Sequence, residues 1–167
     1  MRKVLLLFVS FLIGSVVVSQ NHQMSIGVKG GNIAGGIAGG GGLNFKTFIG
    51  GNNALEFTLG GGNNHLRGSM MYEWQNATGI VDGLDWYLGV GGVIGTWNKG
   101  GSAVNENWKY EQGLYLGAIG AIGLDWNLDP LIGIPIDLAI EMGPYIGVIN
   151  SGGFGWGGSG AIRYVIK

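Results

Sequence analysis

Apolar and polar residues alternate along most of the chain. Past Gln20, no stretch keeps the i, i+3, i+4, i+7 spacing of an amphipathic helix without an interrupting glycine, whereas period-two alternation recurs many times. Such alternation is typical of β-strands, because successive side chains point to opposite faces of a sheet. The chain is therefore predicted to be all-β, with strands at residues 24–31, 41–49, 54–62, 66–74, 84–97, 112–125, 134–149 and 155–166.

The segments between these strands are short and rich in turn-forming residues. Residues 50–53 (GGNN) and 62–65 (GNNH) combine Gly and Asn, which tolerate the positive φ angles of tight hairpins. The longest polar connection, residues 98–112, holds four charged residues and is expected to be a solvated loop. The pattern therefore indicates antiparallel strands joined in chain order.

Charged residues of the predicted strands never share a face with the bulky apolar residues. Lys46, for example, lies with Asn44 on the face opposite Leu43, Phe45 and Ile49. A soluble barrel or sandwich would coat its outer face with many Lys and Glu residues, and that coat is missing. A membrane barrel has bulky apolar residues toward lipid, and eight strands leave an interior that side chains can fill. The predicted fold is an eight-stranded antiparallel up-and-down transmembrane β-barrel.

Ten charged residues are expected, from the phase of the alternation, to face the interior of this barrel. Unpaired charges away from bulk water are costly, so we expect a network of ion pairs and hydrogen bonds that fills the lumen. The ten are Lys29, Lys46, Glu56, Arg67, Glu73, Asp85, Asp125, Asp137, Glu141 and Arg163.

A second set of eight residues is aromatic and lies mostly near the ends of the predicted strands. Amphipathic rings favour the membrane–water interface, so these residues are expected to form an aromatic girdle. They are Tyr72, Trp74, Trp86, Trp97, Trp126, Tyr145, Trp156 and Tyr164.

The composition excludes several other classes of protein. Glycine accounts for 37 of 167 residues but keeps no three-residue period, and only 3 prolines occur, which excludes collagen. The hydrophobic share of 46% excludes simple disorder, and the lack of cysteine excludes disulfide scaffolds and cysteine nucleophiles. Glycine is instead expected in the turns and on inward faces, where a narrow, strongly curved barrel leaves little room.

The first residues are typical of an export signal. A basic start, Arg2 and Lys3, precedes an apolar run at residues 4–18, which is shorter than the roughly 20 residues of a membrane-spanning helix. We predict a cleaved signal peptide at residues 1–19 and a barrel domain at residues 20–167. Cleavage would leave seven basic and ten acidic residues, a balance that argues against nucleic-acid binding.

Five segments, in this order behind an export signal, carry a resemblance to a known group. They are GGLNFKTFIGGNNALEFTLG (41–60), LDWYLGVGGVIGTW (84–97), GAIGAIGLDW (117–126), IPIDLAIEMGPYIGV (134–148) and GSGAIRYVIK (158–167). Over nearly all of residues 24–167 the chain resembles the small eight-stranded outer-membrane β-barrel proteins of Gram-negative bacteria. The resemblance implies contact with outer-membrane lipid and insertion by the outer-membrane assembly machinery. Such barrels usually end on an aromatic residue, whereas this chain ends Ile166–Lys167.

Candidate catalytic residues are few. Some small outer-membrane barrels modify lipids with a His, a Ser and a carboxylate, and His65 lies near Ser69 and Glu73 in the sequence. Four residues along one strand, however, separate His65 from Ser69 by roughly 13 Å, too far for a hydrogen bond. We therefore expect no catalytic residues, no metal site and no cofactor.

Two classes of function follow for such a barrel. The first is an outer-membrane protein with a largely filled lumen and a structural or interaction role carried by its extracellular loops, chiefly residues 98–112. The second is a narrow pore or a carrier of a small hydrophobic molecule, for which interior glycines would leave space. A secreted, aggregating glycine-rich protein is less favoured, because exposed apolar strands are hazardous in water.

Overall fold

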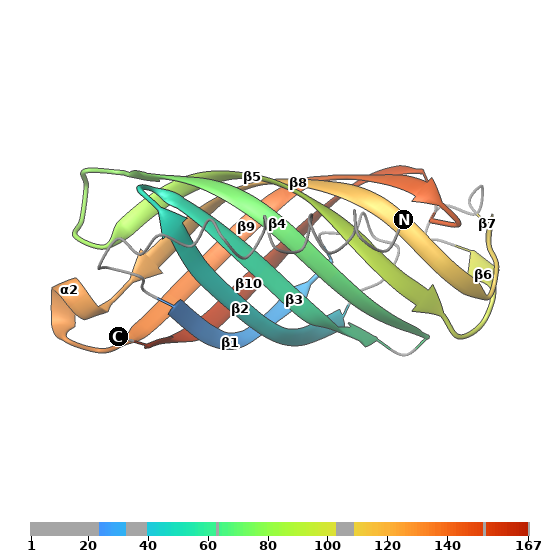
Figure 1. The fold of residues 1–167 in the computed structure, drawn as a ribbon, viewed down its shortest axis with the longest axis horizontal. Coiled ribbons are helices and arrows are strands. Elements are labelled where there is room, and N and C mark those ends of the chain that lie inside the picture. Colours follow the sequence, from blue (N-terminus) through green and yellow to red (C-terminus); the bar gives the residue numbers. More distant parts are fainter. Residues whose placement is uncertain (1–23, 33–39, 63, 103–108, 152, 167) are drawn as a thin grey trace, which may run out of the picture.

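The computed structural model describes residues 24–32, 40–62, 64–102, 109–151 and 153–166. Within these ranges, eight long antiparallel strands close into a barrel (Figure 1). They are β1 (Met24–Gly31), β2 (Gly40–Gly50), β3 (Asn53–Gly62), β4 (His65–Ala77), β5 (Leu84–Trp97), β8 (Gly113–Asn127), β9 (Ile136–Ile149) and β10 (Phe154–Ile166). The predicted signal peptide at residues 1–19 lies outside the described residues.

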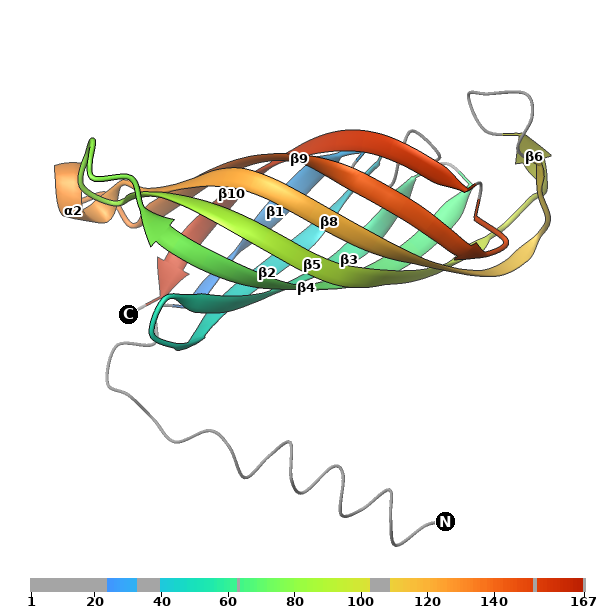
Figure 2. The ribbon, with the colours of Figure 1, turned by 90° about the horizontal axis from the view of Figure 1, so that it is seen from above.

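Each barrel strand pairs with its neighbours in chain order, and β1 closes the barrel by pairing with β10. The predicted eight-stranded antiparallel up-and-down barrel is thereby confirmed. Met24 pairs with Ile166, so the first and last described residues lie at one end, together with the turn at residues 78–83 (Figure 2). We call this the proximal end; the opposite end, which carries the segment 98–112, is the distal end.

Three short elements were not predicted from the sequence. A four-residue helix, α2 (Asp129–Ile132), lies between β8 and β9 at the proximal end, with Pro130 in its first turn and Gly133 at φ 69° as its C-cap. Proline suits the first turn of a helix and a left-handed glycine suits its end, which explains why the helix forms here. At the distal end, β6 (Gly101–Ser102) pairs with β7 (Lys109–Tyr110). No helix within the described ranges is long and apolar enough to cross a membrane.

One wall of the distal half is lined by glycine backbone. A Cβ atom added to the inward-facing Gly42 would lie 2.3 Å from the backbone oxygen of Leu59, and one added to Gly60 would lie 2.2 Å from that of Gly41. Real Cβ atoms do not approach backbone oxygens so closely, so these positions accept only glycine. The predicted reason for the high glycine content, a tightly curved wall, holds for this part of the barrel.

Candidate functional site

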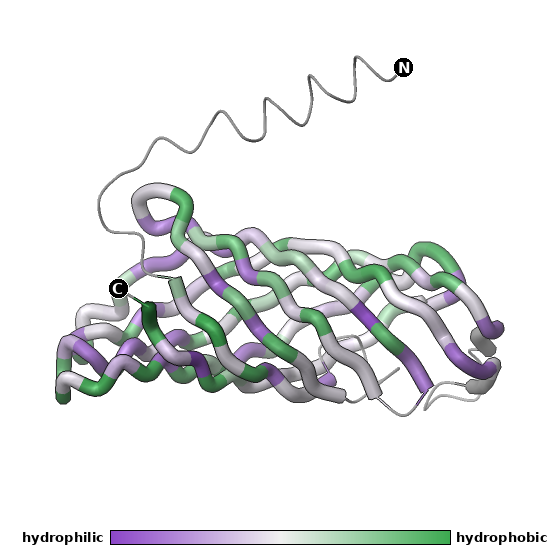
Figure 3. The backbone as a smooth tube through the Cα atoms, turned by 60° about the horizontal axis from the view of Figure 1, so that its bottom comes forward, coloured by the Kyte–Doolittle hydropathy of each residue, from purple (hydrophilic) through white to green (hydrophobic). Residues whose placement is uncertain are grey.

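The two faces of the barrel have opposite polarity. Figure 3 shows hydrophobic and hydrophilic residues alternating along the strands. Leu43 on the outer face is 65% exposed, whereas Lys46 on the inner face of the same strand is 1% exposed. Every charged residue in the eight described barrel strands follows the inward phase. The large exposed hydrophobic side chains of these strands follow the outward phase, except Ile149 at the irregular end of β9.

Arg163 of β10 lies at the centre of the charged interior and is fully buried. Its Nε donates to Asp137 Oδ2 at 3.0 Å, and Nη2 donates to Asp125 Oδ1 at 3.0 Å and to Asp137 Oδ1 at 3.3 Å. Its Nη1 donates to Glu56 Oε2 at 2.7 Å and to Asn44 Oδ1 at 3.0 Å. These five bonds match the five N–H donors of a guanidinium group, so its hydrogen-bonding capacity is fully used.

Lys46 of β2 reaches across the lumen to strands that do not neighbour its own. Its Nζ pairs with Glu73 Oε2 of β4 at 2.8 Å and with Asp125 of β8. Gln75 completes this group, because its Nε2 donates to Glu73 Oε2 at 2.7 Å and to Asp125 Oδ2 at 3.4 Å. The interior therefore links opposite walls of the barrel directly.

Lys29 of β1 forms the third cationic centre. Its Nζ pairs with Glu56 and lies 2.5 Å from Glu141 Oε1. Glu141 also accepts hydrogen bonds from Tyr87 Oη at 2.6 Å and from Ser159 Oγ at 2.5 Å. Because Glu56 binds both Lys29 and Arg163, and Asp125 binds both Lys46 and Arg163, the three centres form one connected cluster, here called the lumen network.

The lumen network contains eight of the ten predicted charged residues: three cations and five carboxylates. Arg67 and Asp85 also face inward, but neither forms a salt bridge to another described residue. Arg67 lines a cavity of about 20 Å³ above the network, and Asp85 lines one of about 200 Å³ near the proximal end. The cavity of about 200 Å³ is also lined by Asp125 and Asp137 of the network. The ion pairs themselves join strands on opposite sides of the barrel.

The distal half of the lumen is occupied by aromatic and aliphatic side chains. The rings of Trp97 and Tyr115 stack with centroids 4.7 Å apart, and His65 lies against Trp97 at 5.4 Å. Val93 and Tyr145 belong to the same buried cluster as the stacked rings. Trp97 also donates from Nε1 to the backbone oxygen of Asn150 at 3.0 Å, which ties this cluster to the loop after β9.

The girdle assignment was wrong for two residues. Trp97 is 3% exposed and Tyr145 is 1% exposed, and both rings lie inside the barrel. The physical reason is phase: each residue stands an even number of positions from an inward-facing residue of its strand, Val93 for Trp97 and Glu141 for Tyr145. Nearness to a strand end determines height along the barrel, whereas alternation determines the face.

The other six residues of that set lie on the outer face. Trp74 and Tyr72 pack edge to face with centroids 4.9 Å apart on β4, and Trp156 near the distal start of β10 packs against Phe154. Five of the six lie toward the proximal ends of their strands, and one lies toward the distal end: Tyr72, Trp74, Trp86, Trp126, Tyr164 and Trp156.

Uncharged members of the interior were not selected from the sequence. Tyr87, Asn44 and Gln75 each bond to the lumen network, and Tyr115 stacks above it. All four stand at even spacing from charged residues of their own strands, so strand phase alone would have identified them. The predicted interior set contained only charged residues, so these four were not part of it.

Nε2 of His65 is buried and has no hydrogen-bond partner among the described residues. Among residues whose positions are described, no group of three or more His, Cys, Asp or Glu side chains is placed to hold a metal ion.

The chain was matched by its fold to a solved structure, whereas its sequence matched no known family. No family model matches the chain, and no curated protein matches it. The chain is similar to the N-terminal β-barrel domain of OprF from Pseudomonas aeruginosa, with a TM-score of 0.60 and 14% sequence identity. The match covers 86% of this chain and 97% of that domain. The two share a fold. At this identity the likeness supports the barrel architecture and says nothing of ligands.

Proposed function

We propose that the chain is an exported outer-membrane β-barrel protein whose lumen is closed and whose role is structural or interactive. The main support for this proposal is that the outer face of the barrel is apolar whereas the inner face is charged. In water, the outward side chains would form an apolar surface far larger than the few hundred Å² that soluble proteins usually expose. In a bilayer the same side chains contact hydrocarbon, and the charges are kept away from it.

The dimensions of the barrel agree with a membrane location. Seven of the eight barrel strands are 10 to 15 residues long, and a tilted transmembrane strand needs about 9 to 11. Trp74, Trp86 and Tyr164 lie on the outer face near the proximal strand ends, where rings suit the interface. Insertion by the outer-membrane assembly machinery is part of the proposal, as is removal of residues 1–19.

Two layers of side chains support a closed lumen. The lumen network occupies the proximal and central part, and the cluster around Trp97 and Tyr145 occupies the distal part. The cavity between them has a volume of about 20 Å³, room for roughly one water molecule. A solute would have to break buried ion pairs to pass. The segment 98–112 and the other distal loops are then the parts of the protein that are free to contact a partner outside the cell.

The proposal is tested by refolding residues 20–167 into vesicles of phosphatidylethanolamine and phosphatidylglycerol. The inserted barrel should migrate differently on detergent gels before and after boiling, because a closed sheet resists detergent until heated. Planar-bilayer recording of the same sample should show no steady conductance. An unchanged migration contradicts the membrane barrel, whereas a stable conductance contradicts only the closed lumen and supports a narrow pore.

A further inference from the structure

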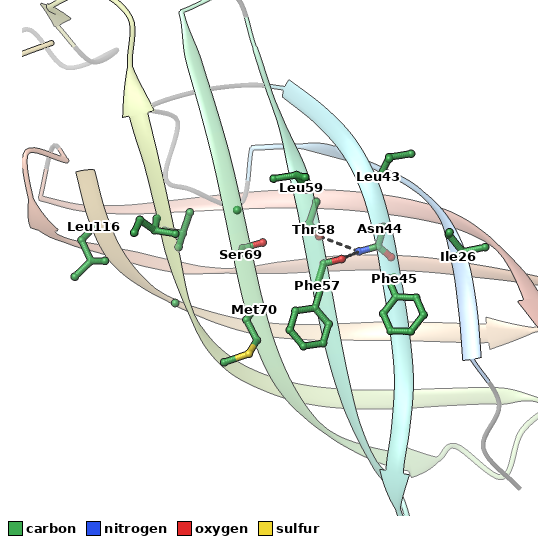
Figure 4. A pocket seen from close by; sticks show the side chains of 14 residues that line it. Ile26, Leu43, Asn44, Phe45, Phe57, Thr58, Leu59, Ser69, Met70 and Leu116 are labelled. Atoms are coloured by element: carbon green, nitrogen blue, oxygen red, sulfur yellow. Dashed lines mark hydrogen bonds between the residues drawn. The ribbon is translucent and has the colours of Figure 1, made fainter. Parts of the chain in front are cut away.

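The outer face of the barrel carries an apolar groove of about 670 Å³ (Figure 4). Its walls are two rows of outward-facing residues, each in register across neighbouring strands. The first row runs through Ile26, Phe45, Phe57, Met70 and Gly92. The second row runs through Leu43, Leu59, Gly68, Ile94 and Leu116.

One glycine interrupts each row, and the barrel itself does not require it. A Cβ atom added at Gly68 would lie 3.9 Å from Leu59 Cδ1, and one added at Gly92 would lie 3.7 Å from the backbone oxygen of Gly117. Both distances are ordinary van der Waals contacts. The inward-facing Gly91, by contrast, would place its Cβ 2.1 Å from the Met70 oxygen. Glycine inside a strand weakens it and often marks a bend or a place where a ligand or another backbone approaches closely. Gly68 and Gly92 differ from the equally open outward Gly30 and Gly160 because they line the groove.

The chemistry of the groove restricts that occupant to hydrocarbon. No charged side chain lines it among the described residues. Its polar lining residues belong to the inward-facing row between the walls, where Asn44 Nδ2 donates to Thr58 Oγ1 at 2.9 Å (Figure 4). Every barrel strand is already paired on both sides, so an extended peptide cannot add to a free edge. An uncharged groove without free donors matches an uncharged chain without polar atoms.

The length of the groove matches one lipid chain. Each row of the groove crosses five strands. The four intervals between them, at roughly 4.8 Å each, make a row about 19 Å long. Half of a hydrocarbon core is about 15 Å thick. Rows of paired residues run perpendicular to their strands, and because membrane-barrel strands are tilted by about 35–45°, the rows lie oblique to the membrane normal and extend through approximately one leaflet. A second copy of the barrel fits less well, because a two-fold contact places the same surface on both sides and would set hollow against hollow.

We propose that this groove is a binding site for one acyl chain of a membrane phospholipid. The proposal rests on the membrane location argued above, and it adds a defined lipid position to an outer face that is otherwise covered by exchanging lipid. The groove is continuous with that apolar outer face. Gly68 lets the chain lie close to the backbone between Leu59 and Ile94, and Gly92 does the same beside Met70.

The test compares a variant whose added side chains fill the groove with a control variant that has the same substitutions elsewhere on the outer face. The double variant Gly68→Leu, Gly92→Leu places side chains in the groove. The control Gly30→Leu, Gly160→Leu alters two outward glycines whose added Cβ atoms would meet only Gly40 O at 3.9 Å and Ala139 O at 3.5 Å. Each protein is refolded in detergent with palmitoyl-oleoyl phosphatidylethanolamine and examined by native mass spectrometry. Wild type and control should retain one lipid, and the groove variant should show about tenfold lower occupancy, the effect of losing burial of roughly two methylenes.

Several results would overturn the assignment. Wild type without a bound lipid, or equal lipid occupancy in all three proteins, contradicts the site. A dimer of wild type that the groove variant loses would assign the surface to a second copy.

Phosphatidylglycerol should bind as well as phosphatidylethanolamine, because the groove has no charge to select a headgroup. A strong preference for one of the two lipids contradicts acyl-chain recognition. The single variant Gly68→Val replaces the double variant if the latter does not refold. Boiling-dependent migration is recorded throughout: its loss in wild type contradicts the membrane barrel, whereas a normal shift without lipid contradicts only the groove.

Discussion

The ring of Tyr87 lies over the backbone of Gly123 on the neighbouring strand. The two residues are direct cross-strand partners, and a Cβ atom added to Gly123 would lie 2.5 Å from Cε1 and Cζ of the ring. From this position the Tyr87 hydroxyl donates to Glu141 at 2.6 Å. Tyr115 covers Gly95 and Tyr145 covers Gly117 in a similar way. Glycine on one strand thus makes room for the tyrosine ring of the neighbouring strand, and these rings occupy the lumen.

This arrangement predicts that Gly123→Ala is destabilising although it adds only a methyl group. The methyl group must displace the Tyr87 ring, which weakens its hydrogen bond to Glu141. Overpacking of a dense interior costs about 1–3 kcal/mol. Urea unfolding of the refolded protein, followed by tryptophan fluorescence and gel migration, measures the loss. Gly92→Ala on the outer face is the matched control, since its Cβ would meet only the Gly117 oxygen at 3.7 Å. Equal stability of the two variants would show that the ring is not held against Gly123.

The lumen network predicts a large effect of Arg163→Met. Removal of the guanidinium leaves the carboxylates of Glu56, Asp125 and Asp137 without one of their cations. Breaking a buried ion pair by deleting one partner costs about 3–5 kcal/mol, so this variant should unfold at much lower urea concentration or fail to refold. Arg67→Met removes an inward arginine that forms no salt bridge to a described residue, and should change stability by about 1 kcal/mol or less. A similar loss in both variants would contradict a connected network centred on Arg163.

Strand phase carried most of the information that the sequence held about this fold. The alternation of charged with apolar residues located β5 at residues 84–97, the range that the structure has, and assigned Lys46 and Arg163 to the interior. The partners of these charges could not be predicted. Lys46 on β2 pairs with residues of β4 and β8, and such contacts across the lumen depend on strand tilt and register, which a single sequence does not reveal.

Position along a strand does not reveal which face a side chain occupies. Trp97 and Tyr145 were assigned to the girdle because they lie near strand ends, although their spacing from Val93 and Glu141 puts them inside. The groove between the rows of Gly68 and Gly92 was not predicted either. Its walls come from six strands and exist only once the register is known.

The hydrogen bonds of the Asn150 side chain anchor the distal segment 98–112 at Glu111. Asn150 has a positive φ of 45°, accepts a hydrogen bond from Glu111 N at 2.8 Å and donates to Glu111 O at 2.8 Å. Asn150→Gly keeps the backbone conformation accessible but removes this side-chain clamp, so barrel stability should change little while trypsin cleaves the segment faster at Lys99. Thr96→Ser on the outer face serves as control. An unchanged cleavage rate would show that the segment is held independently of Asn150.

The two faces of the barrel predict different environments for individual tryptophans. Trp156 is 62% exposed on the outer face, whereas Trp97 is 3% exposed in the lumen cluster. Variants that retain a single tryptophan, with phenylalanine at the other five positions, are refolded into vesicles with and without brominated phospholipid. Because bromine quenches indole fluorescence only near contact, the Trp156 protein should lose most of its emission and the Trp97 protein should lose little. Trp86, also outward, provides a second quenched position near the proximal end. Strong quenching of Trp97 would place its ring in lipid and contradict the closed distal lumen, and absence of quenching at both Trp156 and Trp86 would contradict the membrane location.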